Sequence, residues 1–166
     1  MTRSARLTLL VLVLLACIGC DQGTKRLART HLRSSPTTSY LSDSVRLTYA
    51  ENPGAFLSLG AQLPDSARQG LFTWGVGALL LALAVFALRK RQVGRAELVA
   101  YALMLGGGLS NWGDRVLRGG AVVDFLNLGV GPLRTGIFNV ADVAIVLGVA
   151  LLVLPGTLRA SRGDTA

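Results

Sequence analysis

The chain has 166 residues, of which 51% are hydrophobic and 16% are charged. This apolar composition excludes an ordinary soluble domain, and the length favours a single membrane-embedded unit over residues 1–166. The formal net charge of +8 does not indicate a nucleic-acid-binding protein, because the basic residues lie between apolar blocks and not among aromatic residues in a binding module.

Four apolar runs follow one another along the chain, and each is a candidate membrane span. They are Leu7–Cys20, Leu71–Leu88, Leu98–Gly113 and Gly136–Leu158. A bilayer core about 30 Å thick requires about 20 helical residues, so the first and third runs must include polar residues at one end. We therefore expect spans over about residues 7–27, 69–88, 97–114 and 136–156, with an outer loop at 28–68.

Basic residues flank the spans on one side of the expected bundle. They precede the first run, separate the second from the third and follow the fourth: Arg3, Arg6, Arg89, Lys90, Arg91, Arg95, Arg159 and Arg162. Because loops rich in Lys and Arg stay in the cytoplasm, both termini and the short middle loop are expected there. The loop at 28–68 then faces outward.

The outer loop contains a pattern typical of a strand. Val45, Leu47 and Tyr49 alternate with polar residues, which indicates a half-buried β-strand, and a turn is expected between Asn52 and Gly54. The predicted fold is therefore mainly α, with four transmembrane helices, a small extracytoplasmic β-cradle and a short amphipathic segment.

This topology brings acidic residues together at the outer ends of the spans. Asp21 ends the first span and Asp114 ends the third, while Asp124 lies in the loop before the fourth. A fourth span that starts at residue 136 would place Asp142 about 10 Å inside it, with Asn139 on the same helical face. Ionisable groups inside a membrane span cost about 2.5–3.5 kcal/mol each, and they usually face the bundle interior and serve a function.

Two of these acids, Asp124 and Asp142, predict a specific chemistry. Two carboxyl groups in a partly desolvated pocket share one proton, because both cannot ionise cheaply. The ionised group can then take a proton from water while the protonated group polarises a peptide carbonyl, as in aspartic proteases, without a metal or another cofactor. The alternative is structural: Asp124 stabilises a loop, and Asp142 pairs with Arg115.

The remaining polar residues near the outer face have simple structural interpretations. Asp21 and Lys25 can form an i, i+4 ion pair that ends a helix at the membrane interface. Asn111 and Arg115 share a helical face, and the Arg115 side chain can extend to the lipid headgroups. Gly106–Gly108 indicate close packing of helices, because small residues let membrane helices approach each other.

Three other functions remain open at this point. Lys25 could form a hydrolytic dyad with Ser58 or Ser110. A transporter or channel subunit would use intramembrane acids as an ion relay, although it would distribute them across the membrane depth. Leu14–Cys17 is similar to a lipoprotein cleavage motif, so a lipoprotein or a membrane protein with a cleaved leader is the third possibility.

A metal peptidase and a disulfide-stabilised domain are both disfavoured. His31 is the only histidine, so a zinc site of the HExxH type is not indicated, and we expect His31 on the surface or in a loop. Cys17 and Cys20 lie inside an apolar run, where their spacing suggests neither a disulfide framework nor a metal site.

Five motifs resemble, in order, those of the lipoprotein signal peptidase family, also called signal peptidase II. They are DQGTK (21–25), NPGAF (52–56), GGGLSNWGDR (106–115), AVVDF (121–125) and FNVAD (138–142). The resemblance implies an enzyme of the bacterial inner membrane, in contact with phospholipid, whose active site lies near the periplasmic face. A monomer is expected, because it needs no further assumption. Its substrate would be a diacylglyceryl-modified prolipoprotein, cleaved immediately before the lipidated cysteine.

The same resemblance assigns residues to the site. It implies that Asp124 and Asp142 are the catalytic pair. It also implies a group of residues that bind substrate or support the site: Asp21, Lys25, Asn52, Gly54, Asn111, Asp114, Arg115 and Asn139.

Overall fold

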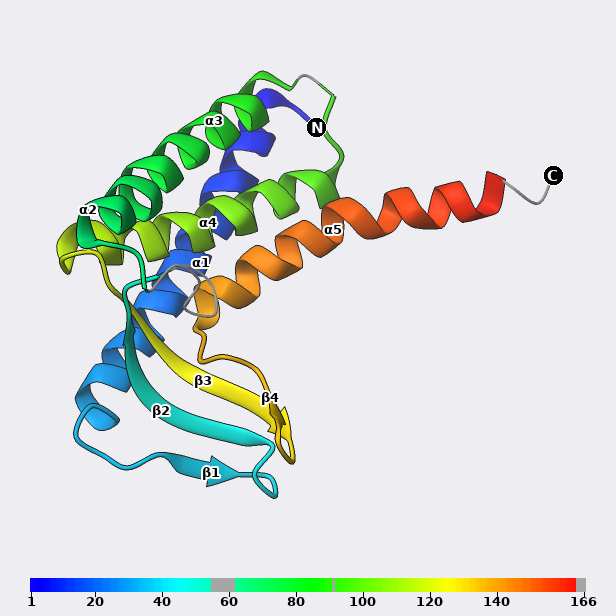
Figure 1. The fold of residues 1–166 in the computed structure, drawn as a ribbon. Coiled ribbons are helices and arrows are strands. Elements are labelled where there is room, and N and C mark those ends of the chain that lie inside the picture. Colours follow the sequence, from blue (N-terminus) through cyan, green and yellow to red (C-terminus); the bar gives the residue numbers. More distant parts are fainter. Residues whose placement is uncertain (55–61, 91, 164–166) are drawn as a thin grey trace.

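The computed structural model describes residues 1–54, 62–90 and 92–163, with side chains up to residue 154. The chain is mainly helical, with a small antiparallel sheet at one end of the helices (Figure 1). In chain order, the elements are α1 (Arg3–His31), β1 (Thr38–Tyr40), β2 (Val45–Asn52), α2 (Asp65–Arg68), η2 (Gln69–Gly75), α3 (Val76–Arg89), α4 (Arg95–Leu117), β3 (Val122–Val130), β4 (Leu133–Arg134) and α5 (Val140–Gly163). This confirms the predicted fold class of helices with a small sheet.

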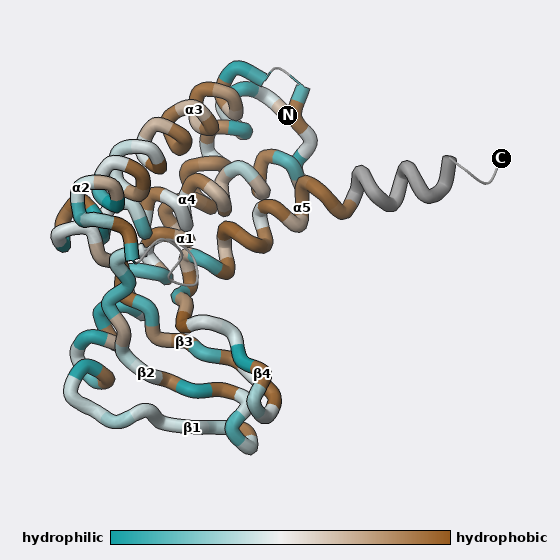
Figure 2. Tube along the Cα trace, in the orientation of Figure 1, coloured by the Kyte–Doolittle hydropathy of each residue, from teal (hydrophilic) through white to brown (hydrophobic). Residues whose placement is uncertain are grey.

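Two helices within the described ranges are long and apolar enough to cross a bilayer. They are α1 and the continuous helix Asp65–Arg89, which comprises α2, the π-helical η2 and α3. The apolar part of α5, Val140–Leu154, is shorter, and the buried face of α4 carries polar residues. Figure 2 shows the hydrophobic residues concentrated on the helices, whereas the sheet alternates polar and apolar residues. Two of the four predicted spans therefore meet the criterion, and spans at α4 and α5 remain predictions.

Helix α4 packs closely against three other helices through consecutive glycines. A Cβ atom on Gly106 would lie 2.8 Å from Cys17 Cβ of α1, and one on Gly107 would overlap the carbonyl oxygen of Ala141 in α5. A Cβ atom on Gly108 would likewise overlap a side chain of α3. Only glycine permits these approaches, so the predicted close packing at residues 106–108 is confirmed.

The sheet has the strand order β1-β2-β3-β4, and every neighbouring pair is antiparallel. The strand predicted around residues 45–49 is β2. Leu47 pairs with Leu126 and Ala50 pairs with Asp124, so β2 uses one residue more than β3 over this interval. This extra residue is a β-bulge.

Strand β3 attaches the sheet to the last turns of α1. Val123 and Phe125 are buried together with Ala28 of α1 in one apolar cluster. Because successive side chains of a strand point to opposite faces, Asp124 points away from this cluster. The packing of its two neighbours therefore directs Asp124 towards the ends of α4 and α5.

Candidate active site

Asp124 is a buried carboxyl group held by two asparagines. Its side chain is 2% exposed, Oδ2 accepts a hydrogen bond from Asn52 Nδ2 at 2.9 Å, and Oδ1 accepts one from Asn139 Nδ2 at 2.6 Å. Burial raises the pKa of Asp124 to about 6, the negative charge of Asp142 adds to this effect, and the two asparagine hydrogen bonds oppose it. Asp124 therefore retains its proton at a higher pH than an ordinary aspartate.

Asp142 lies in the first turn of α5, where it forms a capping box with Asn139. Asn139 Oδ1 accepts a hydrogen bond from Asp142 N at 3.0 Å, and Asp142 Oδ2 accepts one from Asn139 N at 3.1 Å. The prediction that this helix starts at residue 136 was wrong. Phe138 instead pairs with Leu126 of β3, so the helix begins at Val140. Asp142 therefore lies in the first turn of the helix and not about 10 Å inside it.

Asn139 connects the two carboxyl groups. It is fully buried, its amide nitrogen donates to Asp124, and its amide oxygen accepts from the backbone of Asp142. Asn111 of α4 completes the arrangement, because its Nδ2 donates to Asp142 Oδ1 at 2.9 Å. The structure thus brings a carboxyl group from β3 and one from α5 to one shared asparagine, Asn139.

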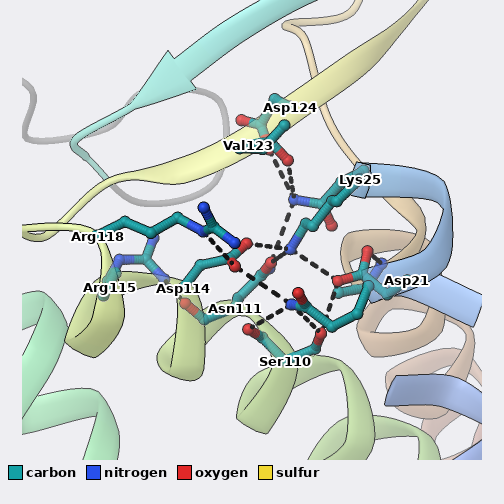
Figure 3. A network of polar contacts seen from close by, with 12 residues as sticks. Asp21, Lys25, Ser110, Asn111, Asp114, Arg115, Arg118, Val123 and Asp124 are labelled. Carbon is teal, nitrogen blue, oxygen red and sulfur yellow. Dashed lines mark hydrogen bonds and ion pairs between the residues drawn. The ribbon is translucent and has the colours of Figure 1, made fainter. Parts of the chain in front are cut away.

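Lys25 lies at the centre of a buried polar cluster (Figure 3). Its Nζ is 2.7 Å from Asp21 Oδ2 and 2.9 Å from Asp114 Oδ2, and it donates to Asn111 Oδ1 at 2.6 Å. These three acceptors match the three N–H donors of an ammonium group. The predicted i, i+4 ion pair of Asp21 and Lys25 is confirmed, but its placement at a helix end at the interface was wrong, because α1 continues to His31 and both side chains are fully buried.

Asp21 joins three helices at this cluster. Its Oδ1 accepts a hydrogen bond from Ala141 N of α5 at 2.8 Å, and its Oδ2 accepts one from Ser110 Oγ of α4 at 2.7 Å. The neighbouring Gln22 was missed in the sequence, although it lies within the DQGTK motif. Gln22 Nε2 donates to Ser110 Oγ at 3.0 Å and to Asp114 Oδ1 at 3.2 Å, so it links α1 and α4.

Arg115 connects α4 to the turn that follows β2. Its Nη2 donates to Gly54 O at 2.7 Å, and Gly54 N donates to Asn52 Oδ1 at 2.9 Å, which confirms the predicted turn. The prediction that Arg115 extends to lipid headgroups was wrong, because the residue is 8% exposed. Among the residues that the structure describes, no ion pair joins Arg115 to Asp142. The alternative in which Asp142 serves only to pair with Arg115 is therefore not supported by such a contact.

The contacts of Lys25 and Ser110 do not suit a serine–lysine dyad. Ser110 Oγ donates to Asp21 and accepts from Gln22, while the Lys25 ammonium is held by three acceptors. A base would need a free lone pair on Nζ. Ser58, the other candidate nucleophile, lies outside the described residues. His31 is exposed at the end of α1, as predicted.

An apolar groove of about 430 Å³ lies beside Asp142, between the sheet and α5. Its remaining walls come from both elements and the segment between them: Leu128, Thr135, Phe138, Val143, Val146 and Leu147. In the described part of the chain, no group of three or more His, Cys, Asp or Glu side chains is placed to hold a metal ion. A carboxyl group at the edge of an apolar groove can act on a chain that is itself largely apolar.

The fold is shared with two solved bacterial membrane enzymes. One, determined by the in meso method at 2.3 Å resolution, matches with a TM-score of 0.78 and 26% identity over 95% of this chain and 91% of that chain. Another, determined by the same method at 1.9 Å, matches with a TM-score of 0.74 and 28% identity over 88% of this chain and 90% of that chain. The class defined by this fold is that of a bacterial membrane enzyme.

Sequence comparisons identify the family. A family model described as signal peptidase (SPase) II matches residues 13–157. The lipoprotein signal peptidase of Sphingopyxis alaskensis is 39% identical over 150 residues, which cover 88% of this chain and 83% of that protein. That of Cronobacter sakazakii is 37% identical over 160 residues, which cover 96% of this chain and 93% of the relative. The chain belongs to the lipoprotein signal peptidase (signal peptidase II) family.

Family membership confirms the resemblance carried by the five motifs. It makes the chain a hydrolase of lipoprotein signal peptides and decides against a transporter or channel subunit.

Proposed function

We propose that the chain is an aspartic endopeptidase that cleaves the signal peptide from diacylglyceryl-modified prolipoproteins, immediately before the lipidated cysteine. Asp124 and Asp142 are the catalytic pair. The observation that carries the proposal is that Asn139 hydrogen-bonds the carboxyl group of Asp124 and caps the helix turn that presents Asp142. An arrangement that serves only loop or helix capping would not require a second carboxyl group beside the buried one of Asp124.

The proposed reaction uses one water molecule and no covalent enzyme intermediate. The ionised carboxylate accepts a proton from water, and the water oxygen attacks the scissile carbonyl carbon while the protonated carboxyl group donates to the carbonyl oxygen. The tetrahedral intermediate then collapses, and the leaving amine nitrogen receives a proton from the pair. The raised pKa of Asp124 supports a proton held within the pair.

The other residues of the site have positioning roles in this proposal. Asn139 and Asn111 orient the two carboxyl groups, while Lys25, Asp21 and Asp114 hold Asn111 in place. Lys25 and Arg118, which pairs with Asp114, balance the charges of the two carboxylates, so the cluster needs no bulk water near the proposed reacting groups.

A second group of residues holds the turn that follows β2 in place. Asn52 hydrogen-bonds Asp124, and Arg115 holds the carbonyl of Gly54, so the turn after β2 stays over the carboxyl pair. We assign to this turn the part of the cradle that covers the scissile bond.

The apolar groove supports the choice of substrate. A signal peptide is an apolar helix, and its lipidated cysteine carries acyl chains, both of which suit walls made by Phe138, Val143 and Val146. The substrate enters laterally from the bilayer, so its scissile bond reaches Asp142 at the edge of the groove.

The proposed location is the bacterial inner membrane, with four spans, both termini in the cytoplasm and the site near the periplasmic face. The basic residues between α3 and α4 and in the first turns of α1 support this orientation by the positive-inside rule. The enzyme acts as a monomer in contact with phospholipid. Retention of α1 is tested by sequencing the mature N-terminus, because cleavage before Cys17 would remove nearly half of this helix.

The decisive experiment measures cleavage of a lipid-modified precursor by purified protein in the presence of a chelator. Asp124→Asn and Asp142→Asn should each abolish cleavage, whereas Asp65→Asn, which changes an exposed carboxylate in α2, should leave it at the wild-type rate. Circular dichroism and thermal unfolding check that the variants fold. Turnover retained by either site variant, or lost by the wild type on chelation, rules out the paired-aspartate mechanism.

A further inference from the structure

A second cavity lies at the opposite end of the helices from the aspartate pair. Its volume is about 590 Å³, and it is bounded by the start of α1, the end of α3 and the first turns of α4. Arg3 at its edge precedes Asp21 in the same helix by a length of about 27 Å, at about 1.5 Å per residue. Figure 1 shows the N-terminus beside the connection between α3 and α4, away from the sheet.

The rim of this cavity is strongly basic. Arg3, Arg6, Arg89 and Lys90 line it, and none of its described lining residues is acidic. The nearby Glu97 forms an ion pair with Lys90 and accepts a hydrogen bond from Tyr101. The partial charges at the start of α1 and the end of α3 have opposite signs and offset each other, so the side chains determine the positive potential here.

The two sides of the rim are held together by a defined contact. Arg6 Nη2 of α1 donates to the carbonyl oxygen of Lys90, the residue that follows α3, at 2.8 Å. The basic residues of α1 and α3 therefore face a common space, and a ligand that binds both sets would strengthen the contact between these helices.

The floor of the cavity is apolar. Leu7 and Leu10 of α1 and Leu98 of α4 contribute to it, and Leu98 is 2% exposed. A soluble anion would gain nothing from such a floor, whereas a phospholipid presents a phosphate next to acyl chains. Basic pockets between membrane helices on the cytoplasmic side suit anionic headgroups for this reason.

We propose that this cavity binds an anionic phospholipid, with its phosphate between Arg3, Arg6 and Arg89 and an acyl chain against Leu7, Leu10 and Leu98. The inference uses the proposed membrane orientation of the helices and does not depend on the aspartate chemistry. The bound lipid connects α1 to the end of α3 and stabilises the fold from the leaflet opposite the aspartate pair.

The test titrates the full chain in detergent with phosphatidylglycerol, phosphatidylcholine or inorganic phosphate. Native mass spectrometry counts retained lipid, and thermal unfolding measures stabilisation. The variant Arg3→Gln/Arg89→Gln removes two charges from the rim and keeps the Arg6 hydrogen bond. The matched control Arg26→Gln/Arg95→Gln removes two exposed charges from α1 and α4 that do not line the cavity.

The wild type and the control should retain about one phosphatidylglycerol with equal affinity, and the rim variant should bind it at least about tenfold more weakly. Phosphatidylcholine should bind more weakly to all three proteins. Equal binding by rim variant and control, equal binding of the two lipids, or the same stabilisation by inorganic phosphate would overturn the proposal. Precursor cleavage is assayed in parallel, so a failure of the peptidase mechanism is separable from a failure of the lipid site.

Discussion

Helix α4 carries an acidic residue near each end, and each acid pairs with a lysine from outside the helix. Near its C-terminal end, Asp114 and Lys25 lie 2.9 Å apart and are 2% and 0% exposed. Near its N-terminal end, Glu97 pairs with Lys90, and their side chains are 26% and 38% exposed. The two pairs have the same charges, but they differ in burial, and Lys25 and Asp114 each have a second ion-pair partner, Asp21 and Arg118.

The energetic consequences differ accordingly. An exposed pair contributes about 0–1 kcal/mol, because water and ions screen it. A buried pair gains little over apolar packing, but removal of one partner leaves an uncompensated buried charge and costs about 3–5 kcal/mol. The buried cluster is therefore explained by what it orients: Lys25 holds Asn111, and Asn111 donates to Asp142.

Replacement of the buried lysine should have the largest effect on stability. Lys25→Met leaves the carboxylates of Asp21 and Asp114 without their shared cation, so we expect a loss of about 3–5 kcal/mol in the free energy of unfolding. Unfolding in detergent micelles measures it. Lys25→Met/Asp114→Asn should recover part of the loss. A single-variant loss below about 1 kcal/mol would make the two pairs of α4 equivalent.

Gly107 lies between Glu97 and Asp114 along α4, where this helix packs closely against α5. A methyl group at this position tests whether the seam, meaning the contact of Gly107 with Ala141, determines the geometry of the buried Lys25–Asp114 pair. Gly107→Ala places a Cβ against the Ala141 carbonyl, so we expect a loss of about 1–3 kcal/mol and weaker cleavage. The control is Gly113→Ala, because a Cβ there meets nothing within 4 Å. That substitution should be neutral or stabilising by up to about 1 kcal/mol, since alanine favours helix. Equal effects of the two substitutions would refute this role of the seam.

The pH dependence of cleavage should respond to a change beside Asp124 and not to a change in the Lys90–Glu97 pair. The Asn52 hydrogen bond stabilises ionised Asp124, so Asn52→Ala should raise the pKa of Asp124 further above about 6. The protonated form then persists to higher pH, and the alkaline limb of kcat/KM should move up by about one pH unit. Glu97→Gln should leave the limb in place. A limb that moves down, or that moves equally in both variants, contradicts the assignment of the limb to Asp124.

Loss of the exposed pair should have the smallest effect. Glu97→Gln removes the charge opposite Lys90 but keeps an acceptor for Tyr101, so we expect a change of less than about 1 kcal/mol in the free energy of unfolding. The same unfolding assay measures it at low and high salt. A loss as large as that of Lys25→Met would reverse the ranking that burial predicts.

The sequence predicted the end of the molecule at which the acids meet, because hydropathy and the positions of basic residues are local signals. It did not predict the burial of Asp21 and Lys25. The partners of Asp21 are Ser110 and Ala141, and those of Lys25 include Asn111 and Asp114. All four lie more than 80 residues away and reach these side chains only in the packed fold. The sequence also did not predict the start of α5, because the apolar Phe138 fits the pattern of a membrane span but pairs with β3. The motifs could name the candidate site residues, whereas the contacts among them required the structure.

The bulge in β2 determines which side chain meets Asp124. With Ala50 opposite Asp124, Asn52 lies on the same face and reaches the carboxyl group with its amide. In an unbroken register, Tyr49 would lie opposite Asp124 and Glu51 would occupy the place of Asn52. Loss of the bulge with no change in strand length would thus replace a neutral donor by a third negative charge beside the proposed catalytic pair, so the register of β2 matters to the site as much as the identity of its residues.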